Sequence, residues 1–575
     1  MRRLISTKTR ETRARRSRAA ARPQLDPITL EVFNHRLGAI AEEMGVTLCR
    51  SAFSPNIKER RDYSCAVFDA AGALAAQAAH IPVHLGSTPL SVRAAIERRP
   101  MGPGDVVILN DPYAGGTHLP DVTAVAPVHV GRRLVGFVAN RAHHADIGGM
   151  SPGSMPLASE IYQEGFRVPP VCLVRGGVIV RDVLELFLAN TRVAEERRGD
   201  LLAQVAALRV GALRLAELVE RDGAAAAQRA MRALQDYSER LMRAALAELP
   251  AGTYRAADHL DDDGLGAERV RIAVAVRIAA AGARVDFSGS AAQVRGGINA
   301  NLAVTLAAVY YVFHALARSP IPPNAGFMRP IAVHAPPGCV VNARFPAAVA
   351  GGNVETSQRI VDVLMRALAG ALPDRIPAAS CGSMNNLAFG GLLPEVWRAA
   401  RRRRRGTGHE TVPGAGQGDT VDRQFSYYET IAGGAGAGPS QSGACAVHTH
   451  MTNTMNTPIE ALEAQLPVRV VRYAVRRRSG GRGRRHGGDG VEREFEFLAA
   501  AQVTLLTERR TLRPYGAAGG GPALAGRNEL RRRNRLVRLP AKVSLAVQPG
   551  DRLRIRTPGG GGWGRSPKDS RRRRS

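Results

Sequence analysis

Two glycine-rich turns, each preceded by a strand-like apolar run, concentrate histidines and carboxylates in one part of this chain. The first turn spans residues 110–121 and the second spans residues 140–149. Together they carry three histidines and three aspartates, namely Asp111, His118, Asp121, His143, His144 and Asp146. Turns that close strands expose side chains to ligands, and imidazole with carboxylate suits a divalent metal. We therefore interpret the rest of the chain as a scaffold for this region.

His118 and Asp121 lie three residues apart, and a histidine of the second turn can complete a set of two histidines and one carboxylate. Such sets leave coordination positions open, as catalytic metal sites do, and they suit Mn, Fe or Zn. The spacing matches no regular metal signature, so a purely structural role in turns and loop hydrogen bonds stays open. His448 and His450 also have chelating spacing, but the two side chains share a face only on a strand.

The length and composition indicate a globular protein of several domains. A chain of 575 residues is too long for one compact core, and two to four domains are expected. No apolar run is long enough to cross a bilayer, so we expect no membrane segment. The six cysteines are scattered without a CxxC pair, which suits a reducing compartment and favours a cytoplasmic location.

The formal charge of +30 raises the question of nucleic-acid binding. Much of the excess lies in arginine runs within residues 1–22, 401–405, 476–485, 531–535 and 571–574. These runs lack interleaved aromatic residues, and aromatic residues make up only 5% of the chain, so no platform for stacking bases is predicted. Like-charge blocks beside Gly and Ser are typical of solvated loops and tails. The sequence argues against a nucleic-acid partner.

Periodicity predicts a mixed α+β fold in several layers, with two to three subdomains and a helical segment inserted between β-rich parts. Asp26 and Pro27 predict a helix start, and residues 269–276 alternate as a strand does. The predicted segments are a disordered basic extension (1–24), an α/β region with the His/Asp turns (25–182), a helical segment (183–250), an α/β region with Gly/Asn-rich loops (251–475), an Arg/Gly-rich surface insertion (476–491), a β-rich C-terminal part (492–564) and a basic tail (565–575).

The segment 351–357 predicts a second type of site, an anion-binding helix start. Its Gly, Asn and Ser residues precede an apolar helix, and free amides at a helix start suit a carboxylate or phosphate. Candidate substrate contacts are Gly352, Asn353, Glu355, Asn385 and His448, the last two from later loops. The chain has no Walker loop, G-x-S-x-G or H-E-x-x-H, so an ATP site is expected on another chain.

Seven motifs taken together resemble those of the hydantoinase B/oxoprolinase family, in order from about residue 25 to residue 564. They are residues 61–64 (RDYS), 80–84 (HIPVH), 110–121 (NDPYAGGTHLPD), 142–149 (AHHADIGG), 351–357 (GGNVETS), 448–454 (HTHMTNT) and the Gly-rich Trp motif at 558–564. The family includes N-methylhydantoinase B subunits, the C-terminal half of ATP-dependent 5-oxoprolinase, and subunits of acetone and acetophenone carboxylases. The resemblance implies a hydantoinase A-type partner that carries the ATP site, in a hetero-oligomer.

The resemblance also implies a function and a ligand set. Metal ligands carried over from the related acetone carboxylase subunit are His118, Asp121 and His143, with His144 as the alternative. Candidate general bases are His84, His144 and Asp146, with the histidines ahead because imidazole titrates near neutral pH. The expected reaction is ATP-dependent hydrolytic ring opening of a cyclic amide, either a hydantoin or the 5-oxoproline of glutathione metabolism. A metal-dependent ketone carboxylase subunit and a non-enzymatic basic scaffold are the alternatives.

Overall fold

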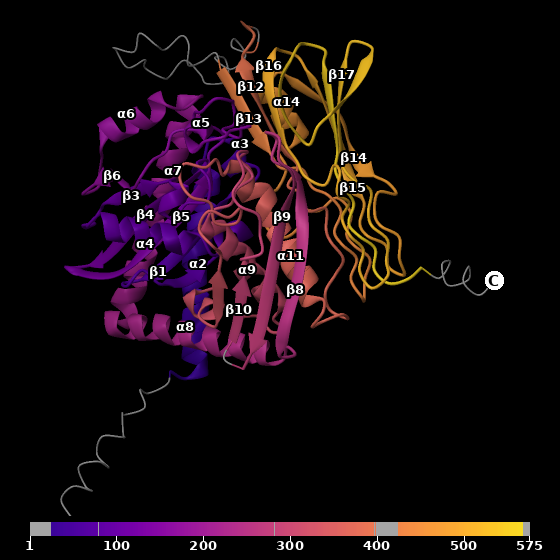
Figure 1. Ribbon diagram of the computed structural model, residues 1–575. Coiled ribbons are helices and arrows are strands. Elements are labelled where there is room, and N and C mark those ends of the chain that lie inside the picture. The colour runs from indigo at the N-terminus through magenta and orange to yellow at the C-terminus, as the bar shows by residue number, and fades with distance from the viewer. Residues whose placement is uncertain (1–24, 79, 281, 396, 398–423, 567–575) are drawn as a thin grey trace, which may run out of the picture.

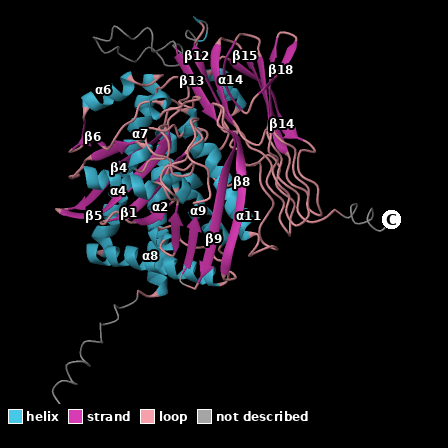
Figure 2. Cartoon of the chain, viewed as in Figure 1, coloured by secondary structure: helices cyan, strands magenta, loops and turns pink. Residues whose placement is uncertain are grey.

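The computed structural model describes residues 25–566 except residues 79, 281, 396 and 398–423 (Figure 1). The predicted extension 1–24, the arginine run 401–405 and residues 567–575 of the predicted tail lie outside the described residues. Figure 2 shows that helices gather in the first two thirds of the fold, whereas strands and long loops make up the C-terminal part. Among the described residues, no helix is both long and apolar enough to cross a membrane.

The N-terminal unit is a seven-stranded sheet with helices on both faces, in the order β2-β1-β5-β4-β3-β6-β7. Its strands are β1 (Tyr63–Asp69), β2 (Leu74–Gln77), β3 (Val106–Leu109), β4 (Asp121–Val130), β5 (Arg133–His143), β6 (Val171–Arg175) and β7 (Val178–Ile179). Cys65 and Val67 pack with α2 (Pro27–Ser51) and α7 (Ala194–Asp222), whereas Ala66 and Phe68 pack with α4 (Thr88–Arg98). Successive strand residues face opposite sides, so both faces of this sheet are buried.

Helix α2 begins where the sequence predicted. The Asp26 side chain accepts a hydrogen bond from the Thr29 amide at 3.0 Å, and Pro27 occupies the first helical position. Its buried stripe includes Phe33, Leu37 and Met44. Helices α6 (Arg181–Ala189), α7 and α8 (Ala224–Ala247) fill the predicted helical segment. Short helices α3 (Pro55–Lys58) and α5 (Ile161–Glu164) lie in the loops around the sheet.

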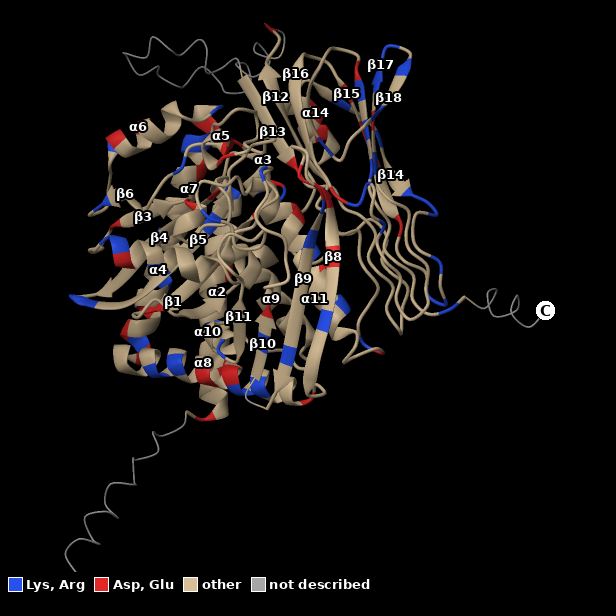
Figure 3. Ribbon diagram, viewed as in Figure 1, with Lys and Arg blue, Asp and Glu red and all other residues tan. Residues whose placement is uncertain are grey.

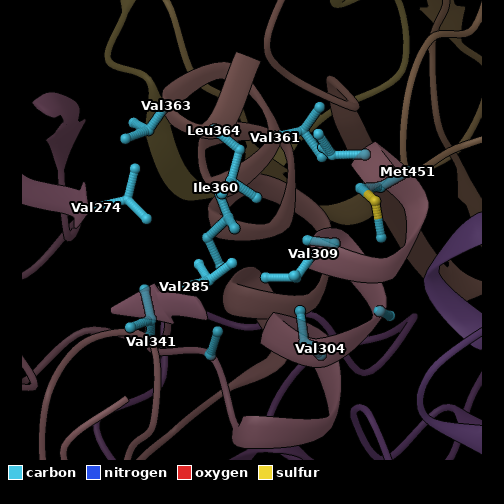
Figure 4. Packing of buried hydrophobic residues seen from close by; sticks show 14 of the residues in the cluster. Val274, Val285, Val304, Val309, Val341, Ile360, Val361, Val363, Leu364 and Met451 are labelled. Atoms are coloured by element: carbon cyan, nitrogen blue, oxygen red, sulfur yellow. The ribbon is translucent and has the colours of Figure 1, made fainter. Parts of the chain in front are cut away.

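The middle unit is a four-stranded sheet, β11-β10-β9-β8, covered by two helices. The strands are β8 (Gly252–Asp262), β9 (Glu268–Ala279), β10 (Gly282–Asp286) and β11 (Ile331–His334), and the helices are α9 (Leu302–Leu316) and α11 (Ser357–Leu368), with the short α10 (Ala325–Met328) between them. Figure 4 shows Val285 of the sheet facing Ile360 of α11, with Val309 of α9 beside them. This apolar contact fixes α11, and with it the loop that precedes it.

The C-terminal unit packs two sheets over one apolar core that also contains α14 (Ile459–Gln465). The four-stranded sheet, β13-β12-β16-β19, consists of β12 (Asn386–Leu392), β13 (Gln424–Glu429), β16 (Ala501–Leu506) and β19 (Lys542–Val547). The five-stranded sheet, β14-β15-β20-β17-β18, consists of β14 (Val468–Arg476), β15 (Gly490–Phe497), β17 (Arg527–Arg532), β18 (Arg535–Leu539) and β20 (Arg552–Arg556). The segment boundary predicted at residue 475 therefore falls inside β14 of the five-stranded sheet. Strands that come later in the sequence complete this sheet.

Four glycine-rich segments, which contain Ala435, Gly488, Gly521 and Gly560, run side by side as a layer of extended chains. They are the long loops on the right of Figure 1. Backbone hydrogen bonds connect them: Gly560 N donates to Gly488 O and Gly488 N donates to Ala435 O, both at 2.9 Å. The segment 476–491, predicted to be a surface insertion, instead lies within this layer, with Gly481, Gly487 and Gly488 buried and its arginines mostly exposed. A side chain on the inner glycines has no space, because neighbouring backbones fill it.

We predict that Gly560→Ala destabilises the protein by roughly 2 kcal/mol or more, since an added Cβ would lie 1.9 Å from the Ala435 carbonyl oxygen. Gly438→Ala is the matched control in the same layer, because a Cβ there meets no atom within 4 Å. Urea unfolding of both variants and the wild type measures the difference. Equal midpoints for the two variants would contradict the packing argument.

Candidate functional site

The three predicted metal ligands meet where β4 begins and β5 ends. Asp121 is the first residue of β4, and in the antiparallel register it pairs with His143, the last residue of β5. His118 lies in the turn that leads into β4, so its ring reaches the same place. One ligand atom from each of His118, Asp121 and His143 lies within 4.8 Å of the others, and all three residues are buried. Strand pairing thus assembles the set from two turns that are adjacent in space.

The free atoms of these side chains fit a metal ion. Nδ1 of His118, Oδ1 of Asp121 and Nε2 of His143 are buried and have no hydrogen-bond partner among the described residues, while His118 Nε2 lies 3.3 Å from Asp121 Oδ2. A buried polar atom without a partner costs about 1–3 kcal/mol, so such atoms gathered at one point call for a ligand. Two imidazoles and one carboxylate are a donor set that Mn, Fe or Zn accepts.

Electrostatics hold Asp121 and His143 in the protonation states that metal binding requires. Burial acts to raise the pKa of Asp121, but the imidazoles of His118 and His84 outweigh it and hold that pKa well below its usual value. Burial lowers the pKa of His143 well below its usual value, and the neighbouring His118 adds to this effect. A carboxylate and a neutral imidazole are therefore both present at neutral pH, as coordination demands.

A second layer of side chains orients the ligands. Asn56 contacts His143 Nδ1 at 3.1 Å, and the Tyr428 ring stacks on the His143 ring with centroids 4.5 Å apart. His84, a predicted catalytic residue, contacts Asp121 Oδ2 through Nε2 at 3.4 Å, while its Nδ1 lies 2.8 Å from Ser64 Oγ. Hydrogen bonds to the distal nitrogen of an imidazole fix its tautomer and direction. His84 therefore belongs to the centre.

Arg60 links this centre to the C-terminal unit. Its fully buried guanidinium donates to the Tyr428 carbonyl oxygen at 3.0 Å and to Thr430 Oγ1 at 2.9 Å. Asn56, Arg60 and Tyr428 were not predicted, because no motif marks a residue that acts through a partner hundreds of positions away. The only sequence signal was their place beside or within quoted segments.

Two other predicted catalytic residues lie outside the centre. Asp146 accepts hydrogen bonds from the Gly148 and Gly153 amides at 2.8 and 3.0 Å and pairs with the Arg192 guanidinium at 3.2 Å. His144 points toward α7, where Nε2 lies 3.0 Å from Gln204 Oε1. The contacts of Asp146 stabilise the loop that follows β5, and the contact of His144 connects the end of β5 to α7. The structure thus places His143, and not the alternative His144, with His118 and Asp121.

A side chain of the chain itself binds the two amides just before the predicted anion-binding helix start. Glu164 Oε1 accepts from the Val349 and Ala350 amides at 2.7 and 2.8 Å, and the Gly352 amide donates to Gly297 O. Residues Gly352–Thr356 form a buried π-helical turn before α11. Within the predicted segment, the Gly352 and Asn353 amides donate to the Gly297 and Val349 carbonyl oxygens, so these two amides are not free for a substrate anion.

The remaining predicted substrate residues have different environments. Glu355 Oε1 accepts from Asn386 Nδ2 at 2.6 Å, and Asn386 Oδ1 accepts from the Tyr428 hydroxyl at 2.7 Å. Glu355 is therefore connected to the ring that stacks on His143. Asn353 Oδ1 is buried without a partner among the described residues. Asn385 is held by the Ile431 carbonyl and Arg510, and His448 lines a hollow away from the metal ligands.

Comparison with known proteins places this architecture in a family. A model of the family hydantoinase B/oxoprolinase matches residues 26–566. The chain belongs to the hydantoinase B/oxoprolinase family. The resemblance of the motifs is thereby confirmed. The chain is 38% identical to the 5-oxoprolinase of Dictyostelium discoideum, with 95% of this chain aligned but only 41% of that protein, so it spans about two fifths of that relative.

Two solved structures share the fold. The ATP-dependent caprolactamase from Pseudomonas jessenii superposes with a TM-score of 0.84 at 30% identity, covering 95% of this chain and 93% of that one. A nucleotide-free acetone carboxylase superposes with a TM-score of 0.83 at 18% identity, covering 95% and 77%. At 18% identity, the similarity to acetone carboxylase shows a shared fold only. The predicted mixed α and β architecture is confirmed by both.

The Glu164 cap gives a prediction about stability and pH. Burial raises the pKa of Glu164 from 4.5 to about 8, against the two amide hydrogen bonds that lower it. Between these values the folded chain holds a proton that the unfolded chain has lost, so the free energy of unfolding falls as pH rises, by about 1 kcal/mol per pH unit. Glu164→Gln keeps the acceptor oxygen but does not titrate, so its stability relative to wild type rises across this window.

Urea unfolding at about pH 5 and about pH 8 measures this change in relative stability. Glu160→Gln, which removes an exposed carboxyl just before the same short helix, serves as the control and is expected to follow the wild type. The same pH dependence in Glu164→Gln and wild type would refute the assignment.

Proposed function

We propose that this chain is the B-type subunit of an enzyme that uses ATP to hydrolyse the ring amide of a cyclic substrate, 5-oxoproline or a hydantoin. The observation that carries the proposal is the buried set of His118, Asp121 and His143, whose free atoms meet at one point. The names of its relatives support the substrate class, because a 5-oxoprolinase and a caprolactamase both act on cyclic amides.

An A-type partner subunit would supply the ATP site. This sequence has no Walker loop, and the caprolactamase chain that it matches is of similar extent although that enzyme is described as ATP-dependent. The Dictyostelium 5-oxoprolinase is more than twice as long as the part that aligns here. Both facts support a nucleotide site outside these 575 residues, and we place it on an A-type subunit of a hetero-oligomer.

The chemistry of the reaction explains why such a centre is needed. A ring amide is stabilised by resonance, and its opening builds negative charge on the carbonyl oxygen. When bound by His118, Asp121 and His143, a divalent metal would supply a Lewis acid for that charge. His84 is proposed as the general base: Ser64 occupies its Nδ1, so Nε2 is the atom that faces the centre and can hold the proton taken from water.

The other predicted residues take supporting roles in this proposal. Glu355 acts through Asn386 and Tyr428 to hold the His143 ring, and burial raises the pKa of Glu355 to about 8. Asn353 keeps the role of substrate contact, because its side-chain oxygen has no partner among the described residues. Gly352 and Asn385 are engaged within the chain, and His144 and Asp146 support the loop that carries His143.

Removing a ligand tests the centre. The chain co-expressed with an A-type partner is assayed for ADP release with 5-oxoproline, hydantoin, caprolactam, and acetone plus bicarbonate, and the metal content of the same sample is measured. We expect a cyclic amide to stimulate turnover, and His118→Ala to lose the metal and at least about 10³-fold in kcat, because one of three ligands is gone. His35→Ala, an exposed histidine on α2, is the control.

Each result has a defined meaning. Stimulation only by acetone with bicarbonate would replace the hydrolase with a carboxylase. Full metal content and full turnover in His118→Ala would contradict the centre altogether.

A second variant separates the general base from the ligands. We expect His84→Gln to keep the metal content of the wild type but to lose about 10²–10⁴-fold in kcat, the usual contribution of a general base. Single-turnover rates and metal analysis on one preparation provide the measurement. Loss of the metal together with activity would show that His84 is a ligand instead.

A further inference from the structure

A surface hollow of about 630 Å³ lies away from the metal ligands, between α9 and three loops. It is lined by Tyr311 of α9, by Asp374 and Arg375 after α11, and by residues of the loops at 435–441 and 448–450. A volume of this order accommodates a small molecule. None of His84, His118, Asp121 and His143 lines the hollow.

The hollow is lined by one negative and one positive side chain, and neither is used in an ion pair within the described residues. Apart from the histidines, Asp374 and Arg375 are the only ionisable acid and base among the lining residues. Neither forms an ion pair with another described residue. The Arg375 guanidinium donates one hydrogen bond, to the Leu316 carbonyl oxygen at 2.7 Å, and its remaining N–H groups are free for an anion.

The rest of the wall is polar but neutral. Burial lowers the pKa of His448 to about 4, with a further effect from Arg60, and burial also lowers the pKa of His450. Both imidazoles are therefore uncharged at neutral pH. Thr449 Oγ1 is buried without a partner among the described residues, and Ser380 contributes a second hydroxyl. A ligand here meets one cation, one anion and several neutral hydrogen-bonding groups.

We propose that this hollow binds an amino acid in its zwitterionic form, with the carboxylate at Arg375 and the ammonium at Asp374. A hollow with one charge of each sign favours a ligand with the same two charges, because a ligand with a single charge leaves one side chain without a counter-ion.

The proposed function supplies the identity of this ligand, and the inference rests on it to that extent. Hydrolysis of a ring amide breaks the C–N bond, adds the hydroxyl of water to the carbonyl carbon and a proton to the nitrogen. When the ring is a lactam, as in 5-oxoproline or caprolactam, the product carries a carboxylic acid and an amine, which ionise to carboxylate and ammonium at pH 7, whereas a hydantoin would leave an uncharged ureido group. The hollow therefore suits the ring-opened product of the reaction rather than its cyclic substrate.

One loop connects the hollow to the reaction centre. His448 and His450 line the hollow, and farther along the same loop the Met455 amide donates to the Arg60 carbonyl oxygen at 2.9 Å. Between them, Met451 is buried beside Val361 of α11 (Figure 4). These two contacts hold the loop segment that contains His448 and His450 in position.

Titration calorimetry on the purified full chain tests the proposal. The probes are L-glutamate and 6-aminohexanoate, compared with glutarate and hexylamine, which lack one of the two charged groups. We expect the zwitterions to bind at least about tenfold more tightly than the other two probes, and Arg375→Ala and Asp374→Asn each to weaken their binding about tenfold. Arg221→Ala and Asp236→Asn remove the same charges from exposed helix positions and are expected to bind as wild type.

The calorimetric results test ligand binding to the hollow independently of the proposed hydrolysis, because this binding requires neither ATP nor a partner subunit. Equal affinity in wild type, Arg375→Ala and Asp374→Asn, or no saturable binding of either zwitterion, would overturn it even if the complex hydrolyses a cyclic amide. Binding that is retained in the inactive His118→Ala variant would support it independently of turnover. Asp374 is exposed and Arg375 is half-buried on a loop, so both variants are expected to fold, which circular dichroism verifies.

Discussion

The buried guanidinium of Arg60 is the contact on which the candidate centre depends. A charge removed from water is tolerated only where acceptors surround it, and here they come from two parts of the fold. Asn56 of the N-terminal unit lies 3.4 Å from it, and the Tyr428 carbonyl and Thr430 hydroxyl belong to the C-terminal unit. The same geometry places the Tyr428 ring over His143. Separating the units would remove the guanidinium's two acceptors in the C-terminal unit and leave the Tyr428 carbonyl oxygen without this donor.

A second group of buried charges joins the middle and C-terminal units. Arg509 donates to Asp362 at 2.6 Å and to Asp258 at 2.9 Å, and Lys542 lies 2.7 Å from Glu508. Because each charge has a counter-ion, the desolvation cost is offset, and removal of one partner would leave the other uncompensated. The loop after β16 is thereby fixed against β8 and α11, and α11 follows directly on the π-helical turn that contains Glu355.

Some of the excess positive charge has a structural explanation. Figure 3 shows blue and red residues close together on the C-terminal strands. On β15 and β20, Glu494 pairs with Arg554 at 2.7 Å and Glu496 with Arg552 at 3.2 Å. Glu494 is buried and its partner Arg554 is partly exposed, so these arginines serve as counter-ions for cross-strand carboxylates of the same sheet. The net charge is therefore a poor guide to a partner of this protein.

The sequence by itself determined the features that act over a few residues. The Asp26 cap and the apolar spacing specify α2. The two Gly-rich turns marked His118, Asp121 and a histidine of the second turn, and the family resemblance favoured His143 over His144. The tertiary structure decided the rest. Glu355, Asn386, Tyr428 and Arg60 come together only when distant strands pair, and the amides before α11 are closed by Glu164 from another unit. Caps and periodicity depend on local hydrogen bonds and side-chain spacing, whereas these contacts depend on which surfaces the whole chain buries together.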